Sequence, residues 1–126
     1  MFKLKEIINM SLNLKSIKDI LISEFSLSEE EVNAYLFMIE AKEFNHSTVA
    51  RELKLDDGKA SFILEKFMKM GLIIKGVNDK YKCLHPRMGL TNLYKIWEQD
   101  MLIMMRRKRA KVELLVRNLT SKYENK

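Results

Sequence analysis

The apolar positions between residues 28 and 41 repeat with a helical period. Val32 is followed by apolar side chains three, four and seven residues later, which places one face of a helix against a core. Ser28 and Glu31 have the spacing of a capping box, in which each residue satisfies a free backbone amide of the other. The pattern therefore predicts a helix from about Glu29 to Ala41.

Residues 1–26 also interleave apolar and charged side chains. This pattern predicts one or two amphipathic helices before the first well-marked one. The apolar positions are Ile7, Ile8, Leu12, Leu14, Ile17, Ile20, Leu21 and Phe25.

Two further helices are expected between residues 45 and 71, separated by a very short connection. Asn45 is the predicted N-cap of a short helix that ends near Lys54. Asp56 is the predicted N-cap of the next helix, and Gly71 supplies the left-handed residue that ends it. The inward stripe of this second helix is Ala60, Ile63, Leu64 and Phe67.

The period changes after Gly71. Residues 72–74 and 81–84 are prone to form strands, and the turn residues between them predict a small hairpin in which Gly76 gives the turn its freedom. Pro86 fits the first position of a long helix that has no strong stop before Tyr123. Its apolar residues, spaced mostly by three and four, predict a dimerisation seam of Leu90, Leu93, Trp97, Met101, Met104, Val112, Leu115 and Leu119.

These elements predict a mainly α fold with a small β-hairpin. The order of helix, helix, turn, helix and hairpin is that of a winged helix-turn-helix domain. We expect an N-terminal helical extension over residues 1–26, the winged domain over 27–85, and a long C-terminal dimerisation helix over 86–126.

The net charge becomes more positive toward the C-terminus. The chain has 126 residues and a net charge of +6, with −3 in residues 1–45, +3 in 46–85 and +6 in 86–126. Such asymmetry favours a nucleic-acid partner, although a solvated surface produces the same balance.

Several function classes are excluded by what the sequence lacks. Cys83 is the single cysteine and is expected to pack inward, so neither an internal disulfide nor a common structural zinc site is expected. No phosphate-binding glycine loop, metalloprotease motif or nucleophile elbow occurs, so we predict neither an enzyme nor a cofactor. No apolar run is long enough to span a membrane, and a cytoplasmic, nucleoid-associated protein is expected.

Three segments carry a resemblance to a known family: LSEEEVNAYLFMIEA, NHSTVARELKLDDGKASFILEKFMKMGLI and YKCLHPRMGLTNLYKIWEQ. Together they resemble the archaeal TrmB-like transcription regulators over roughly Leu27 to Gln99. The resemblance implies a DNA-binding regulator that dimerises partly through helices outside the winged domain. Because the chain stops after one helix, we expect no sugar-sensing domain and identify no small-molecule effector. The sequence departs from the family at Asp56 and Asp57, where a proline or basic residue is common.

The helix-turn-helix geometry selects the expected DNA contacts, because its second helix enters the major groove and its first lies across the backbone. On and before the first helix these are Asn45, Ser47, Thr48 and Arg51; on the second, Lys59, Ser61, Phe62, Lys66 and Lys69; on the wing, Lys75, Asn78 and Lys80. The alternative for the lysines is a solvated face, for Asn45 capping alone, and for Phe62 packing against the N-terminal helices.

The sequence therefore predicts a dimeric regulator that binds double-stranded DNA and needs neither a cofactor nor a membrane. One alternative is a protein-interaction module in which Phe62, Asp56, Asp57 and Glu65 face a protein partner. The other is nonspecific, chromatin-type DNA binding through the basic run from Arg106 to Lys111.

Overall fold

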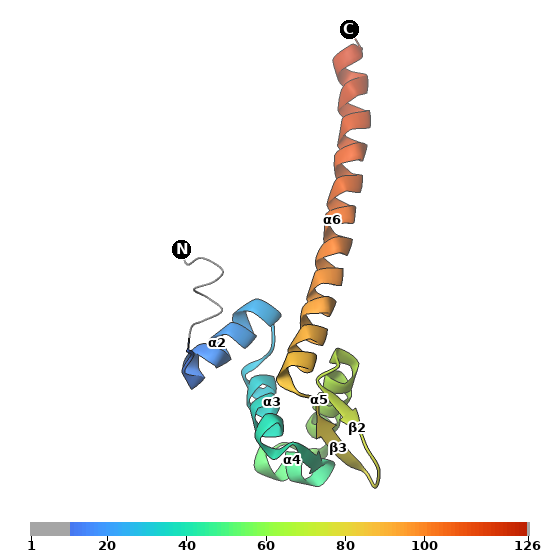
Figure 1. The fold of residues 1–126 in the computed structure, drawn as a ribbon. Coiled ribbons are helices and arrows are strands. Elements are labelled where there is room, and N and C mark those ends of the chain that lie inside the picture. The colour runs from blue at the N-terminus through green and yellow to red at the C-terminus, as the bar shows by residue number, and fades with distance from the viewer. Residues whose placement is uncertain (1–10, 126) are drawn as a thin grey trace.

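The computed structural model describes residues 11–125, which form a small domain with one long helix projecting from it (Figure 1). The predicted apolar positions Ile7 and Ile8 lie outside the described residues. In chain order the elements are α2 (Leu14–Phe25), α3 (Glu29–Ala41), β1 (Glu43–Asn45), α4 (His46–Glu52), α5 (Asp57–Met70), β2 (Ile73–Lys75), β3 (Lys80–Cys83) and α6 (Pro86–Glu124).

The helix boundaries follow the predicted capping residues. Ser28 Oγ accepts a hydrogen bond from the Glu31 amide at 3.1 Å, and Glu31 Oε1 accepts one from the Ser28 amide at 2.9 Å, so the capping box of α3 is confirmed. Asn45 and Asp56 cap α4 and α5 as predicted, each through an Oδ1 atom 2.8 Å from an amide three residues later. Gly71 ends α5 with a φ of 76°.

The wing is a three-stranded antiparallel sheet with the order β1-β3-β2. The sequence predicted β2 and β3 but missed β1, which has only three residues and therefore no readable alternation. Tertiary pairing creates this strand: Phe44 lies opposite Tyr81 and stacks on its ring at a centroid distance of 6.2 Å. Phe44 is buried, so the third strand ties the hairpin to the core.

The hairpin turn does not use Gly76 in the way that the sequence predicted. Gly76 is not in the left-handed region; the residues that adopt it are Asn78 and Asp79, with φ values of 56° and 58°. The Lys80 amide donates to the Val77 carbonyl at 3.2 Å, which closes a tight two-residue turn. Positive φ at both central positions suits Asn and Asp, which tolerate this conformation better than most residues.

The core gathers side chains from every helix and from the sheet. All four predicted inward residues of α5, from Ala60 to Phe67, are buried, and Cys83 packs against the core while half-buried. Burial raises the pKa of the Cys83 thiol.

The first turns of α6 belong to this core, and the rest of the helix does not. Leu93 is 4% exposed, so the structure places it inside its own domain rather than on the free face of α6 where the seam was expected. From Trp97 to Glu124 every residue of α6 is exposed. No helix among the described residues is both long and apolar enough to cross a bilayer.

Tyr35 is the one buried side chain of the described residues whose polar atom has no hydrogen-bond partner. It is 1% exposed, and its ring meets that of Phe67 edge to face at 6.2 Å. Burial raises the pKa of Tyr35 to about 12. The ring therefore stabilises the core, whereas its hydroxyl costs free energy.

We predict that Tyr35→Phe raises the free energy of unfolding by about 1 kcal/mol, because it removes an unsatisfied buried hydroxyl and keeps the ring. Urea denaturation followed by circular dichroism measures the change. Tyr35→Leu is the control that loses the ring contact and is expected to destabilise the fold. A Phe variant less stable than the parent protein would contradict this account.

Candidate nucleic-acid interface

The candidate interface includes the turn between α4 and α5, and contacts of His46 join the two helices across this turn. His46 Nε2 lies 3.0 Å from Ser61 Oγ and 3.2 Å from the Asp57 carbonyl oxygen. Because that oxygen only accepts, Nε2–H is the donor in the contact with Asp57. These contacts link the first residue of α4 to the first two turns of α5, so Ser61 helps to fix the helix pair.

The outer face of α5 presents a mixed set of side chains. Phe62 is 63% exposed, which excludes its predicted alternative of packing against the N-terminal helices. Lys59, Glu65 and Lys69 are also exposed on this helix. A helix face with an exposed aromatic ring and two exposed ammonium groups is able to contact both base edges and phosphates.

Lys66 has a different environment from the other lysines of α5. Its Nζ lies 2.6 Å from Glu31 Oε2, and the Glu31 side chain is only 8% exposed. The pair joins α5 to the start of α3. The sequence assigned Glu31 to the capping box and Lys66 to DNA, and spacing along the chain gave no signal that the two residues meet.

Glu31 therefore has two structural tasks. Burial raises the pKa of its carboxyl, but the hydrogen bonds from Lys66 and Ser28 outweigh burial and hold the pKa below its ordinary value. A carboxylate with a lowered pKa stabilises the fold at neutral pH, and this contribution is lost as the pH falls through that pKa.

Of the four DNA contacts predicted at the start of α4, two are engaged in capping the helix. Asn45 Oδ1 accepts from both the amide and the hydroxyl of Thr48, at 2.8 and 2.9 Å, so this pair is occupied with capping. Ser47 and Arg51 remain exposed. Arg51 Nε is 3.7 Å from the Glu52 carboxylate, but both side chains are more than half exposed, so the guanidinium is only weakly held.

The wing presents all three of its predicted residues to solvent, namely Lys75, Asn78 and Lys80. Lys75 Nζ lies 6.0 Å from the centre of the Tyr81 ring. The sequence analysis overlooked Val77, which is 79% exposed beside the turn. A branched apolar residue within a run of turn residues was the available signal for it.

A groove of about 340 Å³ runs beside Phe62 between α5 and α6. Its lining comes from Phe62, Glu65, Lys66, Lys69, Met70 and Ile96. No group of three or more His, Cys, Asp or Glu side chains suited to a metal ion occurs among residues 11–125. The exposed groups that this region offers to a partner are the lysines and Phe62 of α5 and the lysines of the wing.

Comparison with known families gives one assignment. The sequence model of the family described as "Sugar-specific transcriptional regulator TrmB" matches residues 21–87, which is more than half of the chain. The match includes α3, the helix-turn-helix, the whole wing and the start of α6. No curated protein matches the sequence significantly.

Solved structures share the fold at low identity. TrmBL2, an archaeal chromatin protein whose structure is described as showing a novel mode of DNA binding, gives a TM-score of 0.72 at 18% identity, over 90% of this chain and 45% of that one. A possible transcriptional regulator from Methanosarcina mazei gives 0.55 at 12% identity, over 75% and 87%. A mutant of MepR from S. aureus gives 0.51 at 13% identity, over 98% and 100%. The chain thus spans less than half the length of TrmBL2, and these likenesses show the fold alone.

We predict that Glu31→Gln lowers the free energy of unfolding by about 1–2 kcal/mol at pH 7, because it removes the charge that holds Lys66. The deficit shrinks as the pH falls through the lowered pKa of Glu31, since the parent carboxyl then also becomes neutral. Denaturation curves at pH 7 and pH 3 measure both effects. Glu30→Gln, on an exposed neighbour, is the matched control; equal losses in the two variants would show that the ion pair contributes nothing.

Proposed function

The chain belongs to the TrmB family of transcriptional regulators, and from that premise we propose that it binds double-stranded DNA and regulates transcription as a homodimer. The observation that carries the proposal is the outer face of α5 with its exposed Lys59, Phe62 and Lys69, together with a wing that exposes further lysines. This is the surface that a winged helix-turn-helix inserts into and beside the major groove.

Within α5 we assign distinct tasks to the exposed side chains. Lys59 and Lys69 contact phosphates or guanine acceptors, and the Phe62 ring packs on thymine methyl groups. Ser61 Oγ accepts from the same Nε2–H of His46, so its own O–H is available to donate at the edge of this surface. Lys66 is left out of the contact set, because its ammonium group is already paired with Glu31.

The remaining contacts go to the DNA backbone. Ser47 and Arg51 at the start of α4 are exposed and meet phosphates, while Asn45 and Thr48 shape the helix end that presents the free amides. The wing adds the ammonium groups of Lys75 and Lys80 and the amide of Asn78 along the adjacent groove.

The structural likeness to TrmBL2, an archaeal chromatin protein that binds DNA, supports DNA as the partner. It also keeps sequence-independent binding as the second candidate, which would rest on the basic run of α6. The two functions differ in which lysines and arginines set the salt dependence of binding.

We assign residues 86–126 to dimerisation. The exposed part of α6 carries Trp97, Met101, Met104, Val112, Leu115 and Leu119, each at least 36% exposed, together with Leu90 nearer the domain. A helix that leaves its own domain with such side chains in water is stabilised when a partner covers them. Leu93 is excluded from this surface by its burial, and the half-exposed Tyr94 takes its place.

We predict that Lys59→Ala and Lys80→Ala each flatten the slope of log affinity against log salt by roughly one per subunit, because each removes one phosphate contact. Titration of a labelled duplex by fluorescence anisotropy at several salt concentrations measures the slope. Lys15→Ala, at an exposed position of α2, is the matched control that leaves the slope unchanged. A slope that responds only to substitution of residues 106–111 would instead make α6 the DNA-binding element.

We predict that Trp97→Asp together with Leu115→Asp converts the dimer into a monomer at tens of micromolar, because two charges enter an apolar interface. Light scattering measures the molar mass of the protein in solution. Gln99→Asp with Ser121→Asp adds the same charge on the opposite face of α6 and is expected to leave the dimer intact. A monomeric parent protein would refute dimerisation itself.

A further inference from the structure

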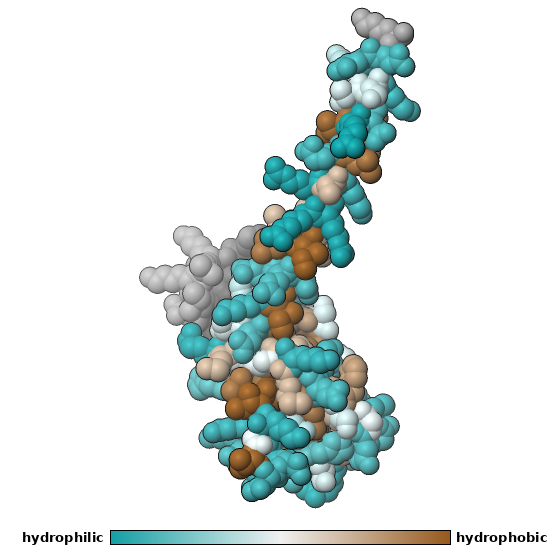
Figure 2. All heavy atoms as spheres, turned by 90° about the vertical axis from the view of Figure 1, so that its right-hand side faces the viewer, coloured by the Kyte–Doolittle hydropathy of each residue, from teal (hydrophilic) through white to brown (hydrophobic). Residues whose placement is uncertain are grey.

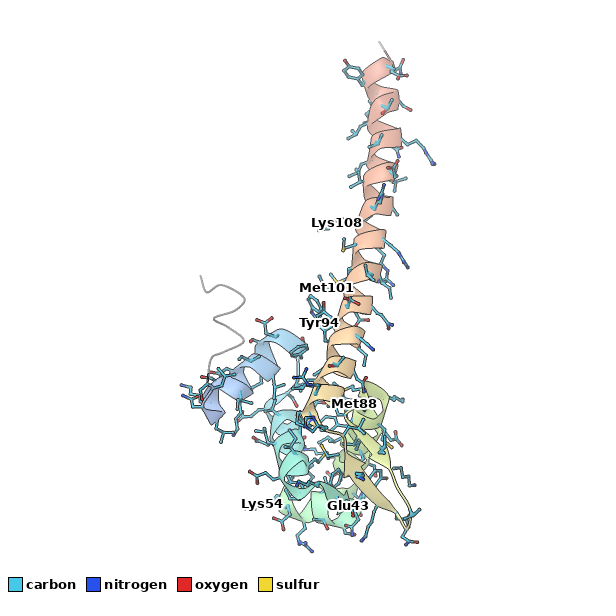
Figure 3. All side chains as sticks on the ribbon, viewed as in Figure 1. Glu43, Lys54, Met88, Tyr94, Met101 and Lys108 are labelled. Atoms are coloured by element: carbon cyan, nitrogen blue, oxygen red, sulfur yellow. The ribbon has the colours of Figure 1, made fainter. Side chains whose placement is uncertain are left out.

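Between Leu90 and Leu119, nine exposed apolar side chains and Lys108 form a stripe along one face of α6, while other exposed apolar residues such as Leu102, Ile103 and Leu114 point elsewhere. Figure 2 shows apolar clusters separated by polar ones along the projecting helix, and Figure 3 shows Tyr94, Met101 and Lys108 on one side of it. At 100° per residue, all members of the stripe fall within about 60° of a common direction. The stripe consists of Leu90, Tyr94, Trp97, Met101, Met104, Met105, Lys108, Val112, Leu115 and Leu119.

The spacing of these residues reads the same in both directions. From Leu90 to Leu119 the steps are 4, 3, 4, 3, 1, 3, 4, 3 and 4 residues, so the pattern is symmetric about the bond between Met104 and Met105. Alternating steps of three and four residues suit parallel and antiparallel pairs alike, so the spacing alone does not choose between them. It does fix the centre of an antiparallel pair, in which each residue of one helix meets a residue equally far from the centre of the other.

We propose that α6 pairs with α6 of a second copy of this chain in an antiparallel arrangement centred between Met104 and Met105. This inference rests on the proposed homodimer and specifies its geometry. In this register Leu90 lies opposite the partner's Leu119, Trp97 opposite the partner's Val112, and Met101 opposite the partner's Lys108. Every stripe residue faces a stripe residue.

The charges beside the stripe support the same register. Glu98 and Arg109 each follow a stripe residue directly and lie on one flank, whereas Asp100 and Lys111 each precede one and lie on the other. Reversing one helix brings like flanks together, so Glu98 meets the partner's Arg109 and Asp100 meets the partner's Lys111. The two-fold axis repeats both ion pairs, which gives four in the dimer.

A parallel, in-register pair lacks this complementarity. It would place Lys108 directly against its own copy and align the whole basic run of residues 106–111 with itself. The antiparallel pair instead sets Lys108 beside Met101, where the aliphatic stem covers the thioether and the ammonium group reaches water. Tyr94 donates a hydrogen bond to Glu98 at 3.2 Å, and this contact orients the carboxylate at the flank.

The arrangement predicts how the two DNA-binding domains are spaced. The two copies of Pro86 would lie about 55 Å apart along the paired helices, since each is opposite the far end of its partner. One turn of DNA spans about 34 Å. The points at which α6 leaves the two domains are therefore separated by more than one turn of DNA.

Disulfide trapping tests the orientation in the full chain, with Cys83→Ala removing the native thiol. The double variant Trp97→Cys/Val112→Cys is expected to form a covalent dimer on mild oxidation, because each cysteine faces the other type in the partner. Neither single variant should crosslink, since like positions lie about 22 Å apart in the antiparallel pair. Efficient crosslinking of either single variant would establish the parallel arrangement and overturn the proposal.

Charge reversal provides a second readout that retains every apolar contact. Glu98→Arg is expected to weaken dimerisation by about tenfold, because it replaces two attractions with two repulsions. Adding Arg109→Glu in the same chain restores the affinity, whereas adding Lys95→Glu does not. Sedimentation of the parent protein separates the two levels of inference: a monomer refutes the homodimer, while a dimer that Arg109→Glu fails to rescue refutes only the antiparallel register.

Discussion

The close approach of α6 to the body of the domain at Gly89 is the constraint on which the arrangement of the whole molecule depends. A Cβ atom at this position would lie 3.2 Å from the Tyr35 hydroxyl and 3.3 Å from Leu72 Cδ2, so a larger residue requires these side chains or the helix to shift by a few tenths of an ångström. Glycine inside a helix costs about 1 kcal/mol relative to alanine. Burial of Leu93 one turn later offsets that cost and locks the direction in which the rest of α6 leaves the domain.

Local signals were sufficient for most of the fold. Ser28, Asn45 and Asp56 each fix a helix start through hydrogen bonds that span three residues, so their effect is visible in the sequence alone. Gly71 and Pro86 mark helix ends for equally local reasons.

Apart from the hairpin turn and Val77, the features that sequence reasoning missed depend on residues far apart in the chain. The strand β1 exists because Phe44 stacks on Tyr81, and Leu93 is buried because α6 docks at Gly89. Of the candidate site, the exposure of Lys59 and Lys69 on α5 followed from helical periodicity, but the pairing of Lys66 with Glu31 did not. The palindromic spacing on α6 was present in the sequence, yet it gained meaning only once the burial of Leu93 showed which face of the helix is free.

The hydrogen bond from Asn92 Nδ2 to the Gly71 carbonyl, 2.8 Å long, has a mechanical consequence. It joins the base of α6 to Gly71, the residue that ends α5, and a Cβ on Gly71 would lie 2.6 Å from the same amide nitrogen, so the two helices are closely packed at this contact. A continuous 39-residue helix acts as a stiff lever about 58 Å long. A tilt of 5° at its base moves its tip by about 5 Å. A small force at the distal end therefore produces a large torque at the contact between α6 and the end of α5.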